Sequence, residues 1–497
     1  MEPVLARPIS APVAAVVLPW AARPPRNVEC IVLGGFICGV GAALLVVGAL
    51  GLGFFLCALL WLAALVVLGG KEGWQRARAR AWPIGPYLFF AAMVAVRACP
   101  QLQALNVSAT VGLGLLLVHT WSGEPVSDGR IATLLAAPMR VLARAFGQGQ
   151  KAWAQVAGPR VLRERLGERG RRVLVGVALA VPLLCGFAAL LASADALFAS
   201  VLSGALRASP SALVRFVGVA GVCSWLTAGL FSHALRRHAP RSPPPAARFA
   251  LGGTEALVVL ASVDALFGIF ALVQLASLFA SPASLAARGI AWSDYARSGF
   301  FQLLAVTVGA LGLLMFLGAF LRTGSEREAR AVKHLAAVMV LLLGGVVASG
   351  LHRMELYERA FGFTRLRLVS QTFMCAMAGL LLYRALTLYW HPERFAVGLL
   401  VAAVVWLGAL NFLNPDALIA RENLRRAAAT GQLDVLYLAT LSDDARPALV
   451  AAPSALSVSS RAALCAVLRS GSQEAGWRGW TLSATRAGAA HLSCASP

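Results

Sequence analysis

Charged side chains are scarce in this sequence. Asp, Glu, Lys and Arg make up 13% of its 497 residues, whereas 59% are hydrophobic and the mean hydropathy is +0.74. A soluble domain carries about 25% charged residues. Negatively charged residues are the scarcer kind, with 22 Asp and Glu against 44 Lys and Arg. The low charge argues against an ordinary soluble domain and points to a protein of the membrane.

Motifs for cofactor and metal chemistry are also missing. The nine cysteines form no C-x-x-C pair, and the chain has no nucleotide-binding P-loop, no H-E-x-x-H and no G-x-S-x-G. We therefore expect no cofactor and no metal. No stretch combines basic residues with a stacking platform, so nucleic acid is not an expected partner. Cys465 and Cys494 could pair if the C-terminal tail lies outside the cytoplasm.

Apolar runs of about 20 residues, long enough to cross a bilayer, recur along the chain. They predict an all-α polytopic transmembrane helix bundle of about eleven spans in the lipid bilayer. The first block, 28–70, would hold two spans, and its Gly35-x-x-x-Gly39 motif would let another helix approach closely. The other nine are expected near 82–98, 104–121, 173–192, 212–235, 254–279, 300–321, 335–352, 368–389 and 395–411.

Polar segments divide these spans into regions. Residues 1–28 are expected to form an N-terminal tail, 29–121 a first membrane region of four spans, and 173–411 a second of seven. Residues 122–172 are basic with apolar residues at helical spacing. This pattern fits either an amphipathic helix on an anionic membrane surface or an ordinary solvated loop. Residues 412–497 are mixed polar and predict a small helical domain.

The distribution of basic residues predicts the orientation. With the N-terminus inside, the N-terminal tail, the inner loops and adjoining span ends hold 27 Lys and Arg, against 9 in the outer loops between spans. Cytoplasmic loops accumulate Lys and Arg, so we expect a cytoplasmic N-terminus and an extracytoplasmic C-terminus. The large positive net charge of the chain has the same explanation.

Polar residues collect in loops that this topology places on the outer side. Two interpretations remain open. The Arg side chains could pair with the acids and tie the outer span ends together, or the same groups could line a pocket in which Arg binds an anionic lipid or glycan. The candidates for this outer-face polar site are Asp294, Tyr295, Arg297, Arg353, Glu355, Tyr357, Arg365, Arg367, Asn414 and Asp416.

One acid is predicted to lie deep in the membrane. Asp264 is about ten residues into the span at 254–279, or roughly 15 Å from its start, and Gln274 follows toward the outer end. Ionisable residues near the midplane are costly, and they are candidates for ion coupling. The alternative is an acid that stays protonated or hydrogen-bonds to a neighbouring helix.

Long motifs lie at 295–304, 353–358, 362–367, 413–417, 419–421, 433–438, 441–449 and 476–480. They resemble a bacterial membrane family known only as domain of unknown function 4173. The resemblance covers about residues 175–490 and implies a polytopic protein of the bacterial inner membrane, but no activity. It puts a specific role for Asp443 in doubt, because the family pattern carries one acid before the alanine.

Three functional hypotheses follow. The first is a structural or sensory envelope protein that binds a partner protein or envelope component through its outer loops and C-terminal tail. The second is a secondary transporter that uses Asp264. The third is an outer-face enzyme on a lipid-linked or glycan substrate, with Asp294, Glu355 or Asp416 as acid or base and Arg353 or Arg365 as anion clamp.

Overall fold

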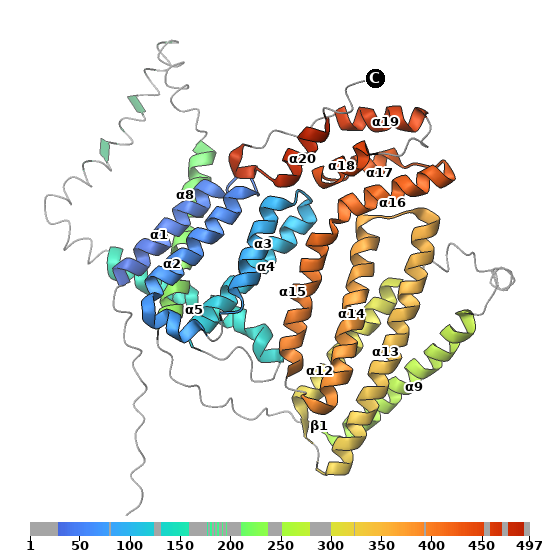
Figure 1. The fold of residues 1–497 in the computed structure, drawn as a ribbon. Helices are drawn as coiled ribbons and strands as arrows, with labels where there is room; N and C mark the ends of the chain where they lie inside the picture. Colours follow the sequence, from blue (N-terminus) through green and yellow to red (C-terminus); the bar gives the residue numbers. More distant parts are fainter. Residues whose placement is uncertain are drawn as a thin grey trace, which may run out of the picture.

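A computed structural model shows an all-helical bundle with a layer of short helices at one end (Figure 1). The structure describes residues 28–78, 81–123, 131–158, 210–236, 251–278, 300–322, 324–391, 394–451, 458–469 and 476–491, with a few single positions between 176 and 195. The predicted span 173–192 and the predicted N-terminal tail lie almost entirely outside these residues.

The first group of helices comes from the N-terminal half of the chain. It contains α1 (Val28–Leu45), α2 (Leu52–Ala77), α3 (Ile84–Val96), α4 (Pro100–Trp121), α5 (Ile131–Ala157) and α8 (Pro210–Leu235). Gly70 has a φ of 55° and breaks α2 at the end of the apolar block 28–70, just before the basic segment that begins at Lys71. Helix α8 packs mainly on α1 and α5.

The second group of helices follows in the chain. It contains α9 (Gly253–Leu278), α12 (Phe300–Phe320), α13 (Glu326–Phe361), α14 (Arg365–Trp390) and α15 (Phe395–Leu413), around a core rich in Leu, Met and Val. Two-residue strands β1 (Leu251–Gly252) and β2 (Leu321–Arg322) pair in parallel beside it. Leu407 and Leu410 of α15 also pack in the core of α2, α3 and α4, so the two groups share one interface.

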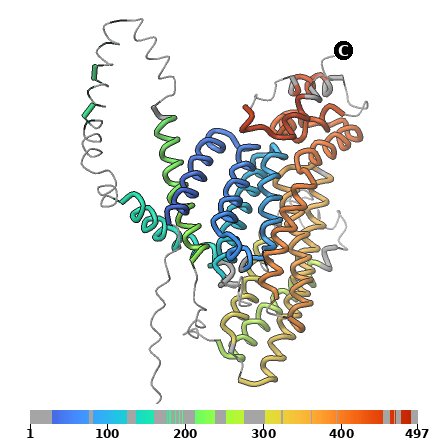
Figure 2. The backbone as a smooth tube through the Cα atoms, turned by 60° about the vertical axis from the view of Figure 1, so that its left-hand side comes forward, coloured from blue at the N-terminus to red at the C-terminus, as the bar shows by residue number. Residues whose placement is uncertain are grey.

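A cap of short helices covers one end of both groups in the two views (Figures 1 and 2). We define the cap as the described residues from Pro415 to His491. It comprises α16 (Pro415–Thr430), α17 (Val435–Ala439), η3 (Asp443–Ala445), α18 (Arg446–Val450), α19 (Val458–Arg469), η4 (Trp477–Gly479) and α20 (Leu482–His491). A small apolar core of its own, including Leu424, Leu438 and Leu464, supports the predicted helical C-terminal domain.

Nine described helices are long and apolar enough to cross a membrane. They correspond to nine of the eleven predicted spans. Helix α3, predicted as a span over 82–98, has 13 residues, or about 20 Å, which is short of the hydrocarbon thickness. Pro83 precedes it, and Arg97 leaves the helical conformation at its end with a φ of −102° and a ψ of 141°.

The prediction of a polar loop from His352 onward is wrong. Those residues continue α13 as a helix to Phe361, nine residues beyond the predicted span end. Glu355 and Arg359 pair one turn apart, which favours helix in a polar sequence. The helix ends at Gly362, whose φ of 77° suits glycine. At its other end, Ser325 caps α13 by accepting the N–H of Glu328.

The sequence left two interpretations of residues 122–172, an amphipathic helix or a solvated loop. The described part forms α5, which buries Val141 and Ala145 against the bundle and exposes Met139 and Phe146. The helix is therefore packed on α8 and not a free loop, while residues 159–172 lie outside the described residues.

Candidate functional site

The candidate site is the joint between the cap and the ends of the bundle, and Asp416 lies at its centre. Asp416 is in the first turn of α16 and its side chain is fully buried. Arg365, the first residue of α14, donates from Nε to Asp416 Oδ1 at 2.7 Å and from Nη2 to Oδ2 at 2.6 Å. Ser442 adds a backbone N–H at 2.8 Å. This two-bond pairing satisfies both carboxylate oxygens.

These contacts keep Asp416 ionised. Burial alone would raise the pKa of its carboxyl, but the hydrogen bonds from Arg365 and Ser442, together with the Arg365 charge, hold the pKa below its usual value. The turn before α16 places the acid: Asn414 adopts a left-handed conformation with a φ of 50°, and Pro415 begins the helix. Asn414 thus shapes the backbone at the joint.

A second buried acid, Asp444, joins the cap to the turn between α3 and α4. Its Oδ2 accepts the backbone N–H groups of Ala98 at 2.8 Å and Cys99 at 2.9 Å. Its Oδ1 accepts the hydroxyl of Ser483 and lies 3.5 Å from Nη1 of Arg97. Asp444 therefore binds the first helix group in the way that Asp416 binds the second.

Amide side chains complete the joint. Asn106 of α4 and Asn411 of α15 are fully buried and exchange two hydrogen bonds of 2.9 and 2.8 Å. Arg97 donates to the backbone oxygen of Asn411. Asn423 of α16 accepts the N–H of Phe363 and donates to its carbonyl, which fastens the α13–α14 turn to the cap. The carboxylate and amide side chains of this joint thus all have partners, as burial requires.

Tyr357 and Arg367 lie beside the same turn. The guanidinium of Arg367 stacks 4.0 Å from the centre of the Tyr357 ring, and it donates to the carbonyls of Phe361 and Gly362. Glu355 faces away on the exposed side of α13 and pairs with Arg359. Glu355 is therefore separate from the buried network.

Arg353 and Gln274 meet between α9 and α13. Arg353 donates from Nη2 to Gln274 Oε1 at 2.9 Å, and the Ser349 hydroxyl donates to the same oxygen at 3.1 Å. The sequence suggested Gln274 as a companion of Asp264; in the structure its amide oxygen accepts hydrogen bonds from two residues of α13. It forms part of the contact between two neighbouring helices.

Asp264 lies midway along α9, with 7% of its surface exposed. Neither carboxyl oxygen has a hydrogen-bond partner within the described part of the chain. Leu260, Val263 and Phe267, on the same stretch of α9, pack into the apolar core of the second group. An acid in such surroundings is costly unless it is protonated or acquires a partner.

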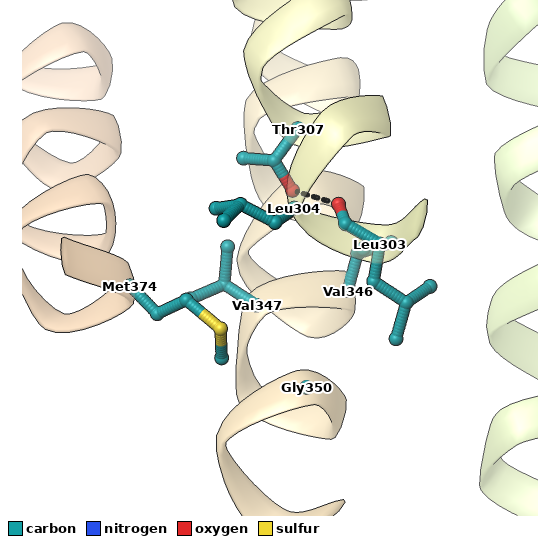
Figure 3. A pocket seen from close by; sticks show the side chains of 7 residues that line it. All are labelled: Leu303, Leu304, Thr307, Val346, Val347, Gly350 and Met374. Carbon is teal, nitrogen blue, oxygen red and sulfur yellow. Dashed lines mark hydrogen bonds between the residues drawn. The ribbon is translucent and has the colours of Figure 1, made fainter. Parts of the chain in front are cut away.

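A narrow apolar pocket lies between α12, α13 and α14 (Figure 3). Thr307 is its one hydroxyl, and this group donates to the Leu303 carbonyl of its own helix at 2.9 Å. The pocket has no room for a water-sized molecule and no charged lining. No group of three or more His, Cys, Asp or Glu in the described ranges could hold a metal ion.

The structure brings together some of the predicted site residues. Arg365, Asp416 and Asn414 form one joint, with Tyr357 and Arg367 next to it, while Arg353 lies with Gln274 and Glu355 stands apart. Asp294, Tyr295 and Arg297 lie outside the described residues. Sequence reasoning missed the part that Arg97, Asn106 and Asp444 play; a lone Arg at a span end was the available signal.

These features define a polytopic, all-helical integral membrane protein. The sequence matches the family described as a domain of unknown function (DUF4153) over residues 84–452, and the chain belongs to that family. The match corrects the expected resemblance to domain of unknown function 4173: the family is one of unknown function, but a different one. It also extends into the N-terminal region, where we found no motif. No curated protein and no solved structure matches the chain.

Proposed function

We propose that this protein is a structural or sensory protein of the bacterial inner membrane that binds an envelope partner through its cap. One observation supports this most strongly. The cap is bound to both helix groups by buried acids, Asp444 to the first and Asp416 to the second. A partner that moves the cap would therefore act on both groups at once.

The charges at the joint favour this role over catalysis. An outer-face enzyme needs an acid or base that can exchange protons with a substrate. Both oxygens of Asp416 are occupied by Arg365 and Ser442, and Arg365 is in turn engaged by Asp416 and the carbonyl of Thr440. These groups are suited to holding the cap in place.

Photo-crosslinking in living cells tests the proposal. A photoreactive amino acid would replace Leu436, which is 84% exposed on α17, and Lys151 on α5 would be the matched exposed control on the predicted inner side. We expect a protein adduct at Leu436 that is absent at Lys151 and is lost when Asp444→Asn loosens the cap. The absence of any adduct at Leu436, Arg425 and Ala463 would contradict a partner on the cap.

A second candidate function, ion-coupled transport, is favoured by Asp264 alone. A buried carboxyl with no hydrogen-bond partner in a membrane helix can bind and release a proton. In proteoliposomes under an imposed potential, Asp264→Asn should abolish proton flux, and Asp264→Glu should retain part of it. Equal flux in the wild type and the Asn variant would remove this candidate.

A further inference from the structure

The turn η4 and the following Trp480 are hydrogen-bonded to the end of the α1–α2 hairpin. The backbone N–H of Leu52, the first residue of α2, donates to the Trp480 carbonyl at 3.0 Å. Arg478 donates from Nη1 to the Leu44 carbonyl, near the end of α1, at 2.9 Å. Both bonds involve backbone groups that helix ends leave unpaired.

Glycines at the hairpin allow this contact. A Cβ added to Gly51 would lie 2.6 Å from the Trp480 carbonyl oxygen and 2.7 Å from the Gly479 carbonyl carbon. The two backbones therefore approach more closely than any larger residue permits. The position of η4 along the α1 and α2 axes is thereby fixed at the hairpin.

The tryptophan side chains remain uncovered despite this attachment. Trp477 is 60% exposed and Trp480 is 40% exposed. Below them, α1 and α2 present exposed apolar side chains over most of their length, including Phe36, Leu44 and Val67. These are membrane-spanning helices, so that face is the one that contacts lipid tails. The hydrogen bonds to Leu52 and Leu44 place the two tryptophans at the level where these helices end.

We propose that η4 and the following Trp480 form an interfacial anchor whose two tryptophans insert among the lipid headgroups of the leaflet next to the cap. Tryptophan has an apolar ring and one N–H donor, and it concentrates at the boundary between headgroups and tails. Arg478 fixes the turn to α1, so the rings are held at this depth by the protein. The anchor joins the cap to the bilayer independently of the buried joint at Asp416 and Asp444.

The test uses the full-length protein labelled with 5-fluorotryptophan in bilayers of phosphatidylethanolamine and phosphatidylglycerol. Trp477→Phe identifies the Trp477 resonance by its disappearance, and Trp480→Phe does the same for the second ring. One sample carries a gadolinium chelate on lipid headgroups, another a water-soluble gadolinium chelate. Ala463→Trp, on the exposed side of α19 in the outermost layer of the cap, supplies a control ring (Figure 1).

We expect the headgroup chelate to broaden the Trp477 and Trp480 resonances beyond detection while the soluble chelate leaves them visible. The Ala463→Trp resonance should show the opposite response. If the soluble chelate broadens Trp477 and Trp480 as strongly as the control, the rings face water and the proposal is wrong. If neither chelate affects them, protein covers the rings, which also overturns the proposal.

Discussion

The buried carboxylates of Asp416 and Asp444 are paired in the same way. Each is a buried acid of the cap that receives an arginine and backbone N–H groups from residues distant in sequence. An ionised carboxylate is tolerated in such a place only when its oxygens are paired. Because removing one partner leaves the other charge unpaired, these contacts are expected to make cap docking all-or-none.

Asp444→Asn tests this at the first helix group. The substitution keeps the shape but leaves Arg97 without its counter-charge and weakens the bonds to Ala98 and Cys99. Breaking a buried pair costs about 3–5 kcal/mol. We expect faster proteolysis of the cap and a lower unfolding temperature in detergent.

Asp443→Asn is the matched control, one residue away. Asp443 pairs with Arg446 in the next turn, and its side chain is partly exposed. Because Asp443 keeps contact with water and its partner lies within one turn, its loss should cost less than the loss of the fully buried Asp444. Equal effects of the two substitutions would show that the buried network is not what holds the cap.

Asp416 makes cap docking sensitive to acid. Its pKa in the folded protein lies below the unfolded value of about 3.9. Its contribution to stability is therefore complete above that value and is lost as the pH falls through the folded-state pKa. The test measures protease resistance of the cap from pH 7 to pH 2 in the wild type and in Asp416→Asn. At neutral pH the wild-type cap should be the more resistant of the two. The difference should shrink in acid; a constant difference at every pH would contradict the assignment.

The sequence predicted part of this chemistry. Pairing of the outer arginines with outer acids was one of the two open interpretations, and the contact of Arg365 with Asp416 agrees with it. The contact of Arg97 with Asp444 joins residues from opposite halves of the chain, and no periodic pattern links two residues so far apart. The family resemblance put a specific role for Asp443 in doubt, but it gave no role to Asp444, and the family that the chain matches is a different one.

At the scale of elements, the glycines of α1 show how close packing is specified. A Cβ on Gly39 would lie 2.4 Å from the Ser224 nitrogen, and one on Gly35 would lie 2.8 Å from the Ala228 nitrogen. The predicted close approach at Gly35-x-x-x-Gly39 is therefore confirmed, and its partner is α8. The motif alone did not identify that partner, because such motifs are common in membrane helices.

Gly39→Ala should separate α1 from α8. The added methyl group meets backbone atoms of Ser224 and Ala220, which cannot move aside as a side chain would. We expect a loss of about 1–3 kcal/mol, measured as a lower unfolding temperature in detergent. Gly221→Ala on α8 is the control, because its Cβ meets nothing within 4 Å. A neutral Gly39→Ala would mean that α1 does not pack on α8 in the membrane.

Element boundaries were harder to predict than element existence. Apolar runs located nine long helices, because a span must be continuous and apolar. They did not locate the end of α13, since residues 353–361 are polar and helical at once. Helices outside a bilayer lose the requirement for apolar side chains, so hydropathy stops carrying information where the helix leaves the membrane.

At the scale of the whole molecule, the contacts of the cap constrain the topology. The cap touches the α1–α2 hairpin at Leu52, the α3–α4 turn at Ala98 and Cys99, and the α13–α14 turn at Phe363. All three turns were assigned to the outer side from the distribution of Lys and Arg. The contacts therefore place these turns on the same face as the C-terminal segment, and the distribution of Lys and Arg predicts the same arrangement.

Reporter fusions give the last prediction. A reporter after Pro497 should be active only outside the cytoplasm, and one inserted after Gly324, before α13, only inside. Three helices, α13, α14 and α15, separate the two points, and each is long enough to cross. Because the α13–α14 turn touches α16 directly after α15, helices α14 and α15 must cross as a pair or not at all. Both reporters on one side would then mean that α13 does not span. Exchanged sides would mean that the whole molecule is inverted, with the cap in the cytoplasm, and the proposed envelope partner would be excluded.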